Sequence, residues 1–547
     1  MKKVILSKLF IITFLFAFAQ KEKLPVIQSP VFKKDTLNIK KYGAIADGNT
    51  LNTKAINDAI ETLSKKGGGV VLVPSGLWLT GPIVIKNNIN LHLTSGATLL
   101  FTPDKNKYPL VEANWEGLPQ MRNQSPISAM NASNIAITGK GIIDGNGDVW
   151  RAVKIDKLTE SQWKNKLASG GVLSEDKKTW YPSESFMKGS KMQNPGVIAA
   201  ERDAAFYQSI KDFLRPNLLL LTNCKTILLE GVTFQNSPAW CLHPLMCRDL
   251  TVREVFVKNP WYAQNGDGID AESCKNVLIE NSVFDVGDDA LCMKSGRDAE
   301  GRKRGMPTEN IIIRGCTVYA AHGGFVIGSE MSGGARNIWV NNCTFIGTDI
   351  GLRFKTTRGR GGIVENIFIN DIYMKDIPAE AILFDMYYMA KDPVALAGEK
   401  RELPKVEFKT VDETTPVFKN FHISNVYCNG AEKGIFVRGL PEMHVKDIVL
   451  ENMVLQADKG IDVQEASGIT FKNIKIISDE TTPVVDVVQS DNLVFDNITY
   501  KDGANLLFRL NGERTKNISI KNTDASKAKE KISYELGATE KSVTAIK

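Results

Sequence analysis

Residues 310–369 contain the stretch that decides the fold, where one short pattern occurs three times: Asn310-Ile-Ile-Ile313, Asn337-Ile-Trp-Val340 and Asn366-Ile-Phe-Ile369. Each copy places an asparagine before an apolar-x-apolar triplet. Further copies of the unit lie at Asn276, Asn420 and Asn492 and near Ile227, Leu250, Ile448, Ile469 and Ile518. Units of roughly two to three dozen residues, with short strands and polar turns, predict a parallel β-helix whose coils bury apolar residues by stacking.

A second strand can be aligned in each unit, and its alternation separates two faces. Two columns of apolar residues are expected to point inward: Ile269, Leu291, Phe325, Leu352, Ile435 and Ile461, then Ala271, Met293, Ile327, Phe354, Val437 and Val463. Two further columns are expected to point outward to solvent: Asp270, Arg353 and Asp462, then Glu272, Lys294, Lys355 and Arg438. Arg353 and Lys355 should therefore face outward together.

Three aspartates open these strands and form the candidate site. Asp267 and Asp289 occupy equivalent places one coil apart. Because stacked strands lie roughly 4.8 Å apart, the two carboxylates are expected to hold one water between them. Asp288 comes one residue earlier and should project differently, and His322 takes the equivalent place in the next coil.

A carboxylate cluster beside a histidine and a basic pair offers the acid, the base and the cationic surface that sugar hydrolysis needs. A single aspartate in a Gly-Asp-Gly turn more often bonds its own backbone, but outward carboxylates stacked over cations are not needed by a core. The other histidines, His92, His243, His422 and His444, have no such neighbours in the alignment. A zinc site is not supported, and neither a metal nor a cofactor is expected.

Basic residues gather in the segments that flank the carboxylates. They are Lys294, Arg297, Arg302, Lys303 and Arg304, followed by Arg353, Lys355, Arg358 and Arg360. Either a solvated basic face or a site for an anionic ligand explains them. The bulk charge of +6, about +3 without the lysines of the N-terminal leader, identifies no partner.

The N-terminus has the pattern of a secretory signal peptide over residues 1–19. Lys2 and Lys3 precede an apolar stretch from Leu9 to Ala19, and Gln20 rather than cysteine follows. We therefore expect a mature protein from about residue 20, secreted or periplasmic, without a lipid anchor or stable membrane insertion. Eight cysteines are too few for a disulfide scaffold in a chain of this length, although export would permit bridges. Cys316 and Cys343, which each follow a repeat strand, are expected to be buried as small apolar residues.

The chain divides into four parts after this leader. Residues 20–105 form an N-terminal cap and first strands, in which a helix with apolar positions from Ala55 to Leu63 ends before Gly67. Residues 106–216 hold the first coils and a large loop insertion, 217–525 the β-helix catalytic domain, and 526–547 a C-terminal tail. The insertion, from Asn146 to Pro216, carries Trp150, Trp163 and Trp180, which either wall a sugar site or are buried beneath the loop.

Four motifs in this order resemble those of the polygalacturonases of glycoside hydrolase family 28. They are Asn265-Gly-Asp267, Gly287-Asp-Asp289, Ala321-His-Gly323 and Arg353-Phe-Lys355. Three positions depart from the family pattern: Gly266 stands where Thr is usual, Ala321 where Gly is usual and Phe354 where Ile is usual. The resemblance implies an all-β, right-handed parallel β-helix of the pectin-lyase-like kind, with an N-terminal capping helix and long loop insertions.

The resemblance also implies roles. Asp288 would protonate the glycosidic oxygen, Asp267 and Asp289 would deprotonate the attacking water, and His322 would orient the acid. Substrate binding would fall to Arg353, Lys355, Asn265 and, as an additional candidate from its column, Lys294. The expected partner is an anionic pectic polysaccharide or oligogalacturonide, not a nucleic acid.

We expect inversion at the anomeric carbon, with acid and base roughly 6.5 to 9.5 Å apart to leave room for water. The insertion and the Gly328–Gly334 turn look like those of bacterial exo-acting members. Alternatives are hydrolysis of rhamnogalacturonan side chains, a calcium-dependent pectate lyase with Asp270 and Glu272 as possible ligands, and a non-catalytic polysaccharide-binding β-helix.

Overall fold

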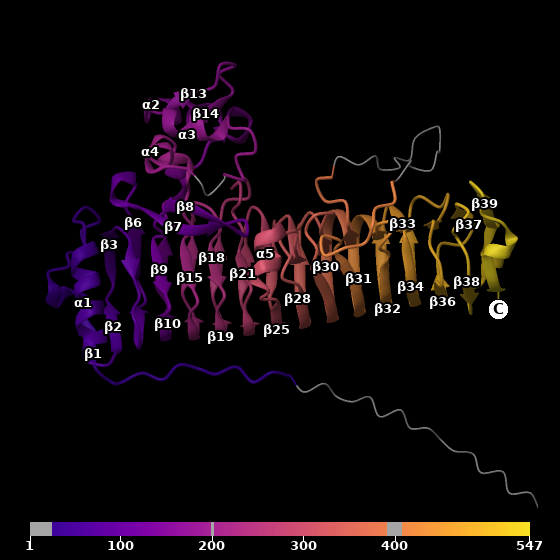
Figure 1. Ribbon diagram of the computed structural model, residues 1–547, viewed down its shortest axis with the longest axis horizontal. Coiled ribbons are helices and arrows are strands. Elements are labelled where there is room, and N and C mark those ends of the chain that lie inside the picture. Colours follow the sequence, from indigo (N-terminus) through magenta and orange to yellow (C-terminus); the bar gives the residue numbers. More distant parts are fainter. Residues whose placement is uncertain (1–23, 199–201, 391–406, 547) are drawn as a thin grey trace, which may run out of the picture.

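The computed structural model describes residues 24–198, 202–390 and 407–546. Within them, 35 strands join in one sheet of parallel pairs that winds into a long right-handed β-helix (Figure 1). The predicted fold class is confirmed. The predicted signal peptide, residues 1–19, lies outside the described residues.

Three rows of strands run along the solenoid. The site row consists of β4 (Ile83–Val84), β9 (Ile127–Met130), β15 (Leu219–Thr222), β18 (Leu242–Leu245), β21 (Ile269–Glu272), β24 (Asp289–Lys294), β27 (Gly323–Ile327), β29 (Leu352–Lys355), the ends of β30 (Ile363–Asp385) and β31 (Val417–Arg438), β33 (Lys459–Gln464), β35 (Val485–Val488), β37 (Ala504–Asn511) and β39 (Ala528–Glu535).

The asparagine row consists of β1 (Thr36–Asn38), β2 (Gly69–Val73), β5 (Ile89–Leu93), β10 (Ser133–Gly139), β16 (Lys225–Glu230), β19 (Arg248–Arg253), β22 (Lys275–Glu280), β25 (Thr308–Arg314), β28 (Ala335–Ile346), the beginnings of β30 and β31, β32 (Val445–Ala457), β34 (Ala466–Ser478), β36 (Val494–Thr499), β38 (Ile518–Lys521) and β40 (Val543–Ile546). The third row begins with β3 (Gly76–Thr80), β6 (Ala97–Phe101), β11 (Ile142–Asp144), β17 (Thr233–Gln235), β20 (Phe256–Lys258), β23 (Val283–Asp285) and β26 (Thr317–Tyr319). It continues through the later parts of β28, β32 and β34 and the middle parts of β30 and β31.

The register of the site row matches the sequence alignment. Ile269 pairs with Leu291, Leu291 with Phe325, and Phe325 with Leu352, and all four side chains are fully buried. A one-residue slip would turn every side chain of a strand to the other face, so this register fixes which residues point away from the core.

Asparagine side chains form a ladder of hydrogen bonds along the beginnings of the strands in the asparagine row. Asn310, Asn337 and Asn366 adopt left-handed φ values of 56 to 59°, which asparagine tolerates better than most residues. Each donates its side-chain Nδ2 to the Oδ1 of the asparagine one coil earlier, over 3.1 to 3.2 Å. The ladder explains why an asparagine precedes each apolar triplet.

A helix covers the N-terminal end of the solenoid. α1 (Thr53–Lys65) buries Ile56, Ala59, Ile60 and Leu63 against the first coils, as predicted (Figure 1). At the other end, residues 526–547, expected to be a tail, contribute β39 and β40, which continue the stack on β37 and β38. No described helix is long and apolar enough to cross a membrane.

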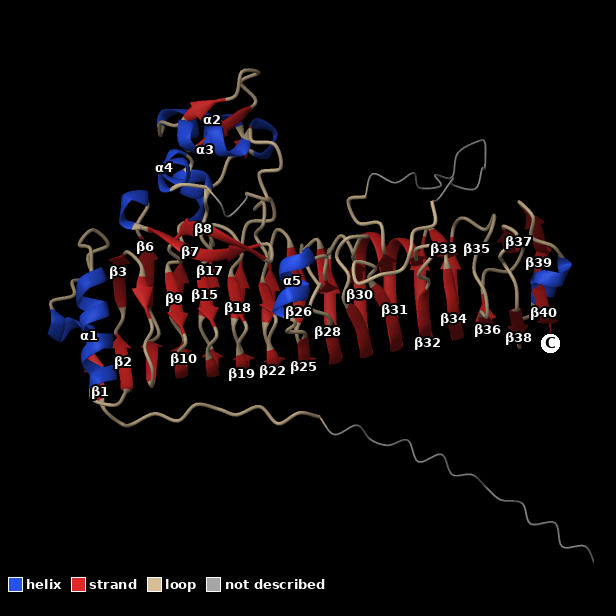
Figure 2. Cartoon of the chain, in the orientation of Figure 1, coloured by secondary structure: helices blue, strands red, loops and turns tan. Residues whose placement is uncertain are grey.

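The loop insertion forms a lobe on one edge of the solenoid (Figure 2). The lobe contains β12 (Val153–Lys154), α2 (Glu160–Ala168), β13 (Val172–Leu173), β14 (Thr179–Tyr181), α3 (Glu184–Ser190) and α4 (Ala204–Ser209). A hairpin of β7 (Leu110–Trp115) and β8 (Leu118–Asn123) lies beneath it. Trp150 and Trp180 are buried and Trp163 is half-buried, so the first two do not wall a sugar site.

All eight cysteines are buried and free. Seven of them pack in the core, including Cys316 and Cys343 as predicted, whereas Cys292 pairs in register with Asp270 in a column that points away from the core. The outward columns differ from prediction near the candidate site. Asp270 and Glu272 are fully buried, and Lys294 and Lys355 are each only 5% exposed. They point away from the core, but ion pairs and neighbouring loops cover them, so the expectation that they face solvent is wrong.

Candidate active site

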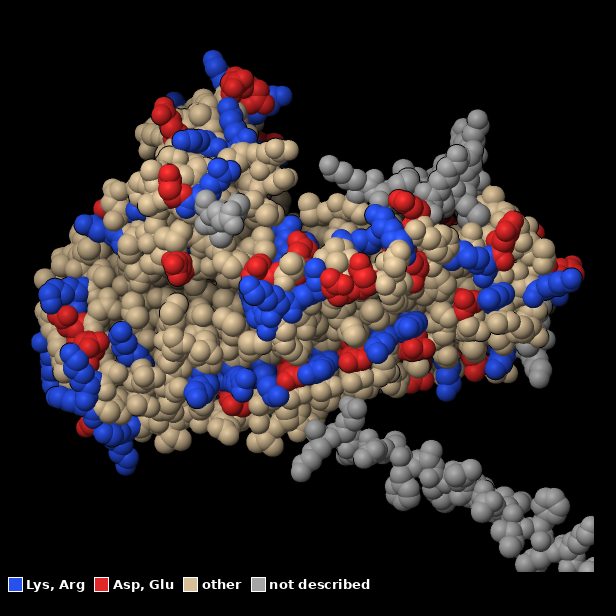
Figure 3. Space-filling model, viewed as in Figure 1, with Lys and Arg blue, Asp and Glu red and all other residues tan. Residues whose placement is uncertain are grey.

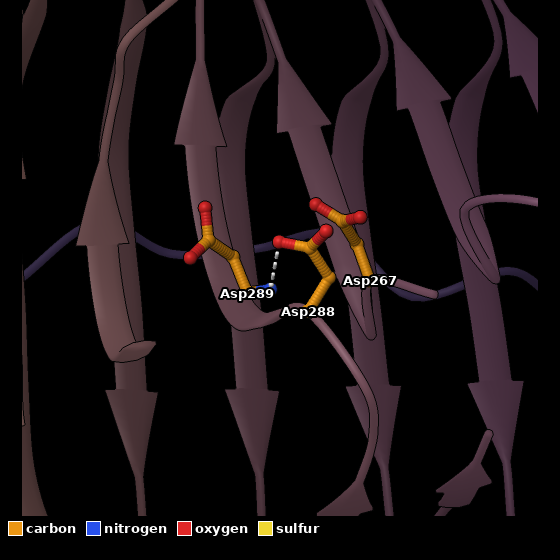
Figure 4. Close-up of side chains that lie close together, drawn as sticks. All are labelled: Asp267, Asp288 and Asp289. Carbon is orange, nitrogen blue, oxygen red and sulfur yellow. Dashed lines mark hydrogen bonds between the residues drawn. The ribbon is translucent and has the colours of Figure 1, made fainter. Parts of the chain in front are cut away.

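Three aspartates converge where β21 and β24 begin (Figure 4). Asp267, Asp288 and Asp289 each place one carboxylate oxygen within 4.8 Å of the others. Gly268 donates its backbone N–H to the Asp289 carbonyl over 2.9 Å, which fixes the two coils against each other. The backbone N–H of Asp289 donates to Asp288 Oδ1, also over 2.9 Å.

The three carboxylates differ in exposure. Asp267 and Asp289 are buried, whereas the Asp288 side chain is 22% exposed. Asp288 is therefore the member of the trio that a ligand from solvent reaches most directly.

Two cations hold Asp289. Lys355 Nζ donates to its Oδ2 over 2.7 Å, and an Arg353 guanidinium nitrogen donates to its Oδ1 over 3.1 Å. Burial alone would raise the pKa of Asp289, but Lys355 and Arg353 outweigh it and hold that pKa below its ordinary value. Asp289 is thus an anion in the free protein.

Asp267 has the opposite electrostatics. Burial, together with the charges of Asp270 and Asp288, raises the pKa of Asp267 well above its ordinary value. Its Oδ1 is buried and has no hydrogen-bond partner in the described structure. Two adjacent carboxylates are therefore driven to different protonation states by their surroundings.

His322 lies between two carboxylates. Its Nδ1 is 3.3 Å from Asp288 Oδ1, and its Nε2 is 3.7 Å from Asp349 Oδ2. The interaction with Asp288, aided by the charge of Asp349, raises the pKa of His322. The side chains of His322 and Asp349 are half exposed, so this pair marks the open edge of the site.

Asp349 was missed by the sequence analysis although the signal was available. It precedes Leu352 by three residues, as His322 precedes Phe325 and Asp288 precedes Leu291. The observed pairs of those apolar residues put Asp288, His322 and Asp349 in one column.

The other two predicted binding residues, Lys294 and Asn265, also have protein partners. Lys294 Nζ lies 3.0 Å from Glu330 Oε2 and 3.6 Å from Asp270 Oδ1. Asn265, in a left-handed turn, accepts a 2.8 Å hydrogen bond at Oδ1 from the buried Arg215. Both contacts position the turns and loops around the trio.

His243 does have a charged neighbour, contrary to the sequence alignment. Its Nε2 lies 2.9 Å from Glu272 Oε2, and Arg304 donates to Glu272 Oε1 over 2.6 Å. The three side chains form a network beneath α5 (Asp298–Arg304). Because His243 and Arg304 engage both oxygens of Glu272, this carboxylate is a poor candidate for a calcium ligand.

Asp270 is a buried carboxyl with no hydrogen-bond partner at either oxygen in the described structure. Burial, opposed in part by Lys294 and reinforced by Asp289, raises the pKa of Asp270 to about 8. Asp270 also acts on the trio, because its charge is one of the causes that raise the pKa of Asp267.

The trio could also hold a cation, since three carboxylate oxygens within 4.8 Å match a set of hard ligands. Lys355 and Arg353 compete with this, because they already satisfy both oxygens of Asp289. The same proximity corrects one expectation: the nearest oxygens are closer than the separation of roughly 6.5 to 9.5 Å predicted for inversion.

The hairpin tip closes over one side of the site. Trp115 stacks on Trp240 with ring centroids 5.7 Å apart, and Lys294 Nζ lies 5.1 Å from the Trp240 ring. Glu116 accepts a 3.0 Å hydrogen bond from Arg297. These contacts contribute to the burial of Lys294.

Two family models match the chain. The model described as glycosyl hydrolases family 28 matches residues 203–430, which include every predicted site residue. The model described as rhamnogalacturonase A/epimerase, pectate lyase-like, matches residues 36–192.

Among curated proteins, the chain is 30% identical over 344 residues to a probable polygalacturonase of Vitis vinifera, covering 61% of this chain and 60% of that protein. It is 29% identical over 368 residues to an exo-poly-alpha-D-galacturonosidase of Dickeya chrysanthemi, covering 64% of this chain and 57% of that protein. The chain thus spans less than two thirds of the length of these relatives.

A solved exopolygalacturonase of Thermotoga maritima has 32% sequence identity to this chain and a TM-score of 0.62. The alignment covers 79% of this chain and 89% of that one. The shared fold, this coverage and the match over the coils that hold the aspartates lead to one conclusion: the chain belongs to glycosyl hydrolases family 28.

Proposed function

We propose that the protein hydrolyses α-1,4-linked galacturonate in pectin. The observation that carries this proposal is the carboxylate trio, with one open member beside His322 and one buried member held by Arg353 and Lys355. Such a site offers a proton donor, a charged acceptor and cations near an acidic sugar. The names of the Vitis and Dickeya relatives support the same substrate class.

Asp288 is the proposed general acid. It is the most exposed of the three carboxylates, and His322 lies beside it. In this mechanism Asp288 protonates the glycosidic oxygen as the bond to the anomeric carbon breaks. His322 orients the carboxyl group of Asp288.

Asp289 is the proposed proton acceptor. Its lowered pKa keeps it anionic, while the raised pKa of Asp267 opposes the base role expected for that residue. We therefore assign proton transfer from water to Asp289, and to Asp267 a hydrogen bond that holds the same water.

Inversion of configuration belongs to this proposal, although the carboxylate separation does not support it. The support is the position of Asp289: its side chain is only 2% exposed, and Lys355 and Arg353 hold its two oxygens in place, so the carboxylate cannot move to form a bond with carbon. Water, rather than a carboxylate, then attacks the anomeric carbon, and a single displacement inverts it.

We further propose that the enzyme releases terminal sugars. The hairpin of β7 and β8 reaches Arg297 and stacks on Trp240, so a long polymer meets an obstruction on that side of Lys294. A digest whose early products are mainly long oligosaccharides would contradict exo action.

The signal peptide predicted at residues 1–19 supports action outside the cytoplasm. N-terminal sequencing of the exported protein tests this proposal.

A pectate lyase is the second candidate, because the trio could ligate a divalent cation. One assay separates the two. Purified protein is incubated with polygalacturonate and a rhamnogalacturonan, with and without a chelator, while reducing ends and ultraviolet absorbance are followed. Hydrolysis gives chelator-resistant reducing ends on polygalacturonate without absorbance, whereas a chelator-sensitive, absorbing product identifies the lyase. Reducing ends from rhamnogalacturonan alone overturn the substrate assignment.

A further inference from the structure

An exposed tryptophan lies next to the catalytic turns. Trp261 is 60% exposed and belongs to the turn between β20 and Asp267. A Cβ on Gly287 would lie 2.4 Å from the Pro260 carbonyl oxygen and 2.9 Å from the Ala263 nitrogen. The backbone on both sides of Trp261 therefore packs directly against the residue that precedes Asp288.

This turn is held firmly. Ala263 donates its N–H to the Pro260 carbonyl over 2.8 Å, and Gly266 donates to the Ala263 carbonyl over 2.9 Å. A Cβ on Gly266 would lie 2.7 Å from Ala263 Cβ, which accounts for glycine where the family usually has threonine. Trp261 is thus presented from a fixed backbone.

A lysine from the lobe reaches the same tryptophan. Lys157 follows β12, is exposed, and places Nζ 4.9 Å from the centroid of the Trp261 ring. Within the described part of the chain, no carboxylate lies at ion-pair distance from Lys157. Figure 3 shows a recess at the foot of the lobe, on the side facing the C-terminal coils.

We propose that Trp261 and Lys157 form a binding subsite for one uronate residue of the substrate, next to the catalytic aspartates. The indole offers an apolar face to a sugar ring, and the ammonium offers a charge to its carboxylate. Because Trp261 is 60% exposed on a rigid turn, its indole is available to a ligand without rearrangement of the backbone. This inference rests on the proposed function and names a substrate contact outside the carboxylate trio.

Steady-state kinetics with trigalacturonate test the subsite. W261A is expected to raise KM about 10-fold, as the loss of a well-buried aromatic contact does, while kcat changes little. W261F, which keeps an aromatic face, should recover most of the affinity. The matched control is W339A, because Trp339 is a half-buried tryptophan of β28 that stacks on Phe368 in the asparagine row.

The lysine is tested by the charge of the substrate. K157A should raise KM about 2- to 5-fold for trigalacturonate, the effect of one exposed ion pair, and should leave the KM of its methyl ester unchanged. The control is K164A, an exposed lysine of α2. An equal increase in KM for trigalacturonate and for its methyl ester would contradict the proposal that Lys157 binds the carboxylate.

Two outcomes separate this inference from the proposed function. If the wild-type protein cleaves trigalacturonate but W261A and K157A keep its KM within 2-fold, the subsite is refuted and the proposed hydrolase function is retained. If the wild-type protein cleaves nothing, quenching of tryptophan fluorescence by trigalacturonate still tests the subsite. A quench that W261F retains weakly and W261A loses supports the subsite, and a quench unchanged in W261A refutes it.

Discussion

Asp289 is the residue whose state most affects the proposed chemistry, since two cations keep it ionised. Removing Lys355 should raise the pKa of Asp289 toward its ordinary value. Because the proposed acceptor works only as an anion, the acidic limb of kcat/KM should move to higher pH in K355A. K355R should move it less. An acidic limb unchanged in K355A would show that Asp289 is not the group that titrates.

The titration of His322 should determine the alkaline limb of the pH profile of kcat/KM. Asp288 and Asp349 raise the pKa of His322, and activity that depends on the protonated form falls as pH rises through that pKa. D349N removes one of the two acidic neighbours, so the pKa of His322 and the alkaline limb of the pH profile should move to lower pH. An unchanged limb in D349N, together with a normal profile in H322N, would contradict this role.

Asp270 should make the fold less stable in alkali. Its pKa is about 8 in the folded protein and near 4 when unfolded, so between these values the folded state binds more protons. The free energy of unfolding therefore falls as pH rises across this window, and it levels off above it. D270N, which is always neutral, should lose this component in thermal unfolding from pH 5 to 9. A parallel decline in both proteins would contradict the shift.

At the scale of the strand, the alternation in β21, β24, β27 and β29 was enough to predict the faces and the register. It placed Asp267 and Asp289 in equivalent positions, and the structure stacks them as predicted. The same pattern could not show that Asp270 and Lys294 are buried, because the partners of Lys294 lie outside these four strands: Glu330 pairs with it, and Trp240, on which Trp115 of the β7–β8 hairpin stacks, packs against it.

Pair-specific contacts were also beyond the sequence. Nothing in the alignment indicates that Lys355 reaches Asp289 rather than solvent, or that Trp261 meets Lys157 across about a hundred residues. Such contacts depend on side-chain direction and loop path, which periodicity does not encode.

The asparagine row gives a stability prediction. N310A loses two ladder bonds, the one donated to Asn276 and the one accepted from Asn337, and puts alanine at a left-handed φ that asparagine tolerates better. We expect a loss of about 3 kcal/mol in the free energy of unfolding, as the sum of two hydrogen bonds and the backbone cost. N310G adopts this φ freely and should lose about 2 kcal/mol, from the hydrogen bonds alone. Urea unfolding measures both, and a glycine variant less stable than the alanine variant would contradict the backbone argument.

For the molecule as a whole, the solenoid is the support and the additions on one edge shape the site. The site row presents the trio, and the hairpin and the lobe supply Trp115, Glu116 and Lys157 around it. The β-helix is shared with the family, whereas the length of substrate that fits beside the trio depends on the hairpin and the lobe. The proposed exo mode and the proposed subsite at Trp261 therefore depend on these additions as well as on the β-helix.

The central claim is that the trio hydrolyses galacturonan with water as the nucleophile and Asp288 as the acid. Proton NMR of the first products from polygalacturonate, with the wild-type protein and D288N side by side, tests it most directly. The account predicts galacturonate released first as the β-anomer from α-linkages, and a rate at least about 10²-fold lower in D288N. The α-anomer as first product, an unsaturated product, or a D288N variant as fast as the wild type would contradict it.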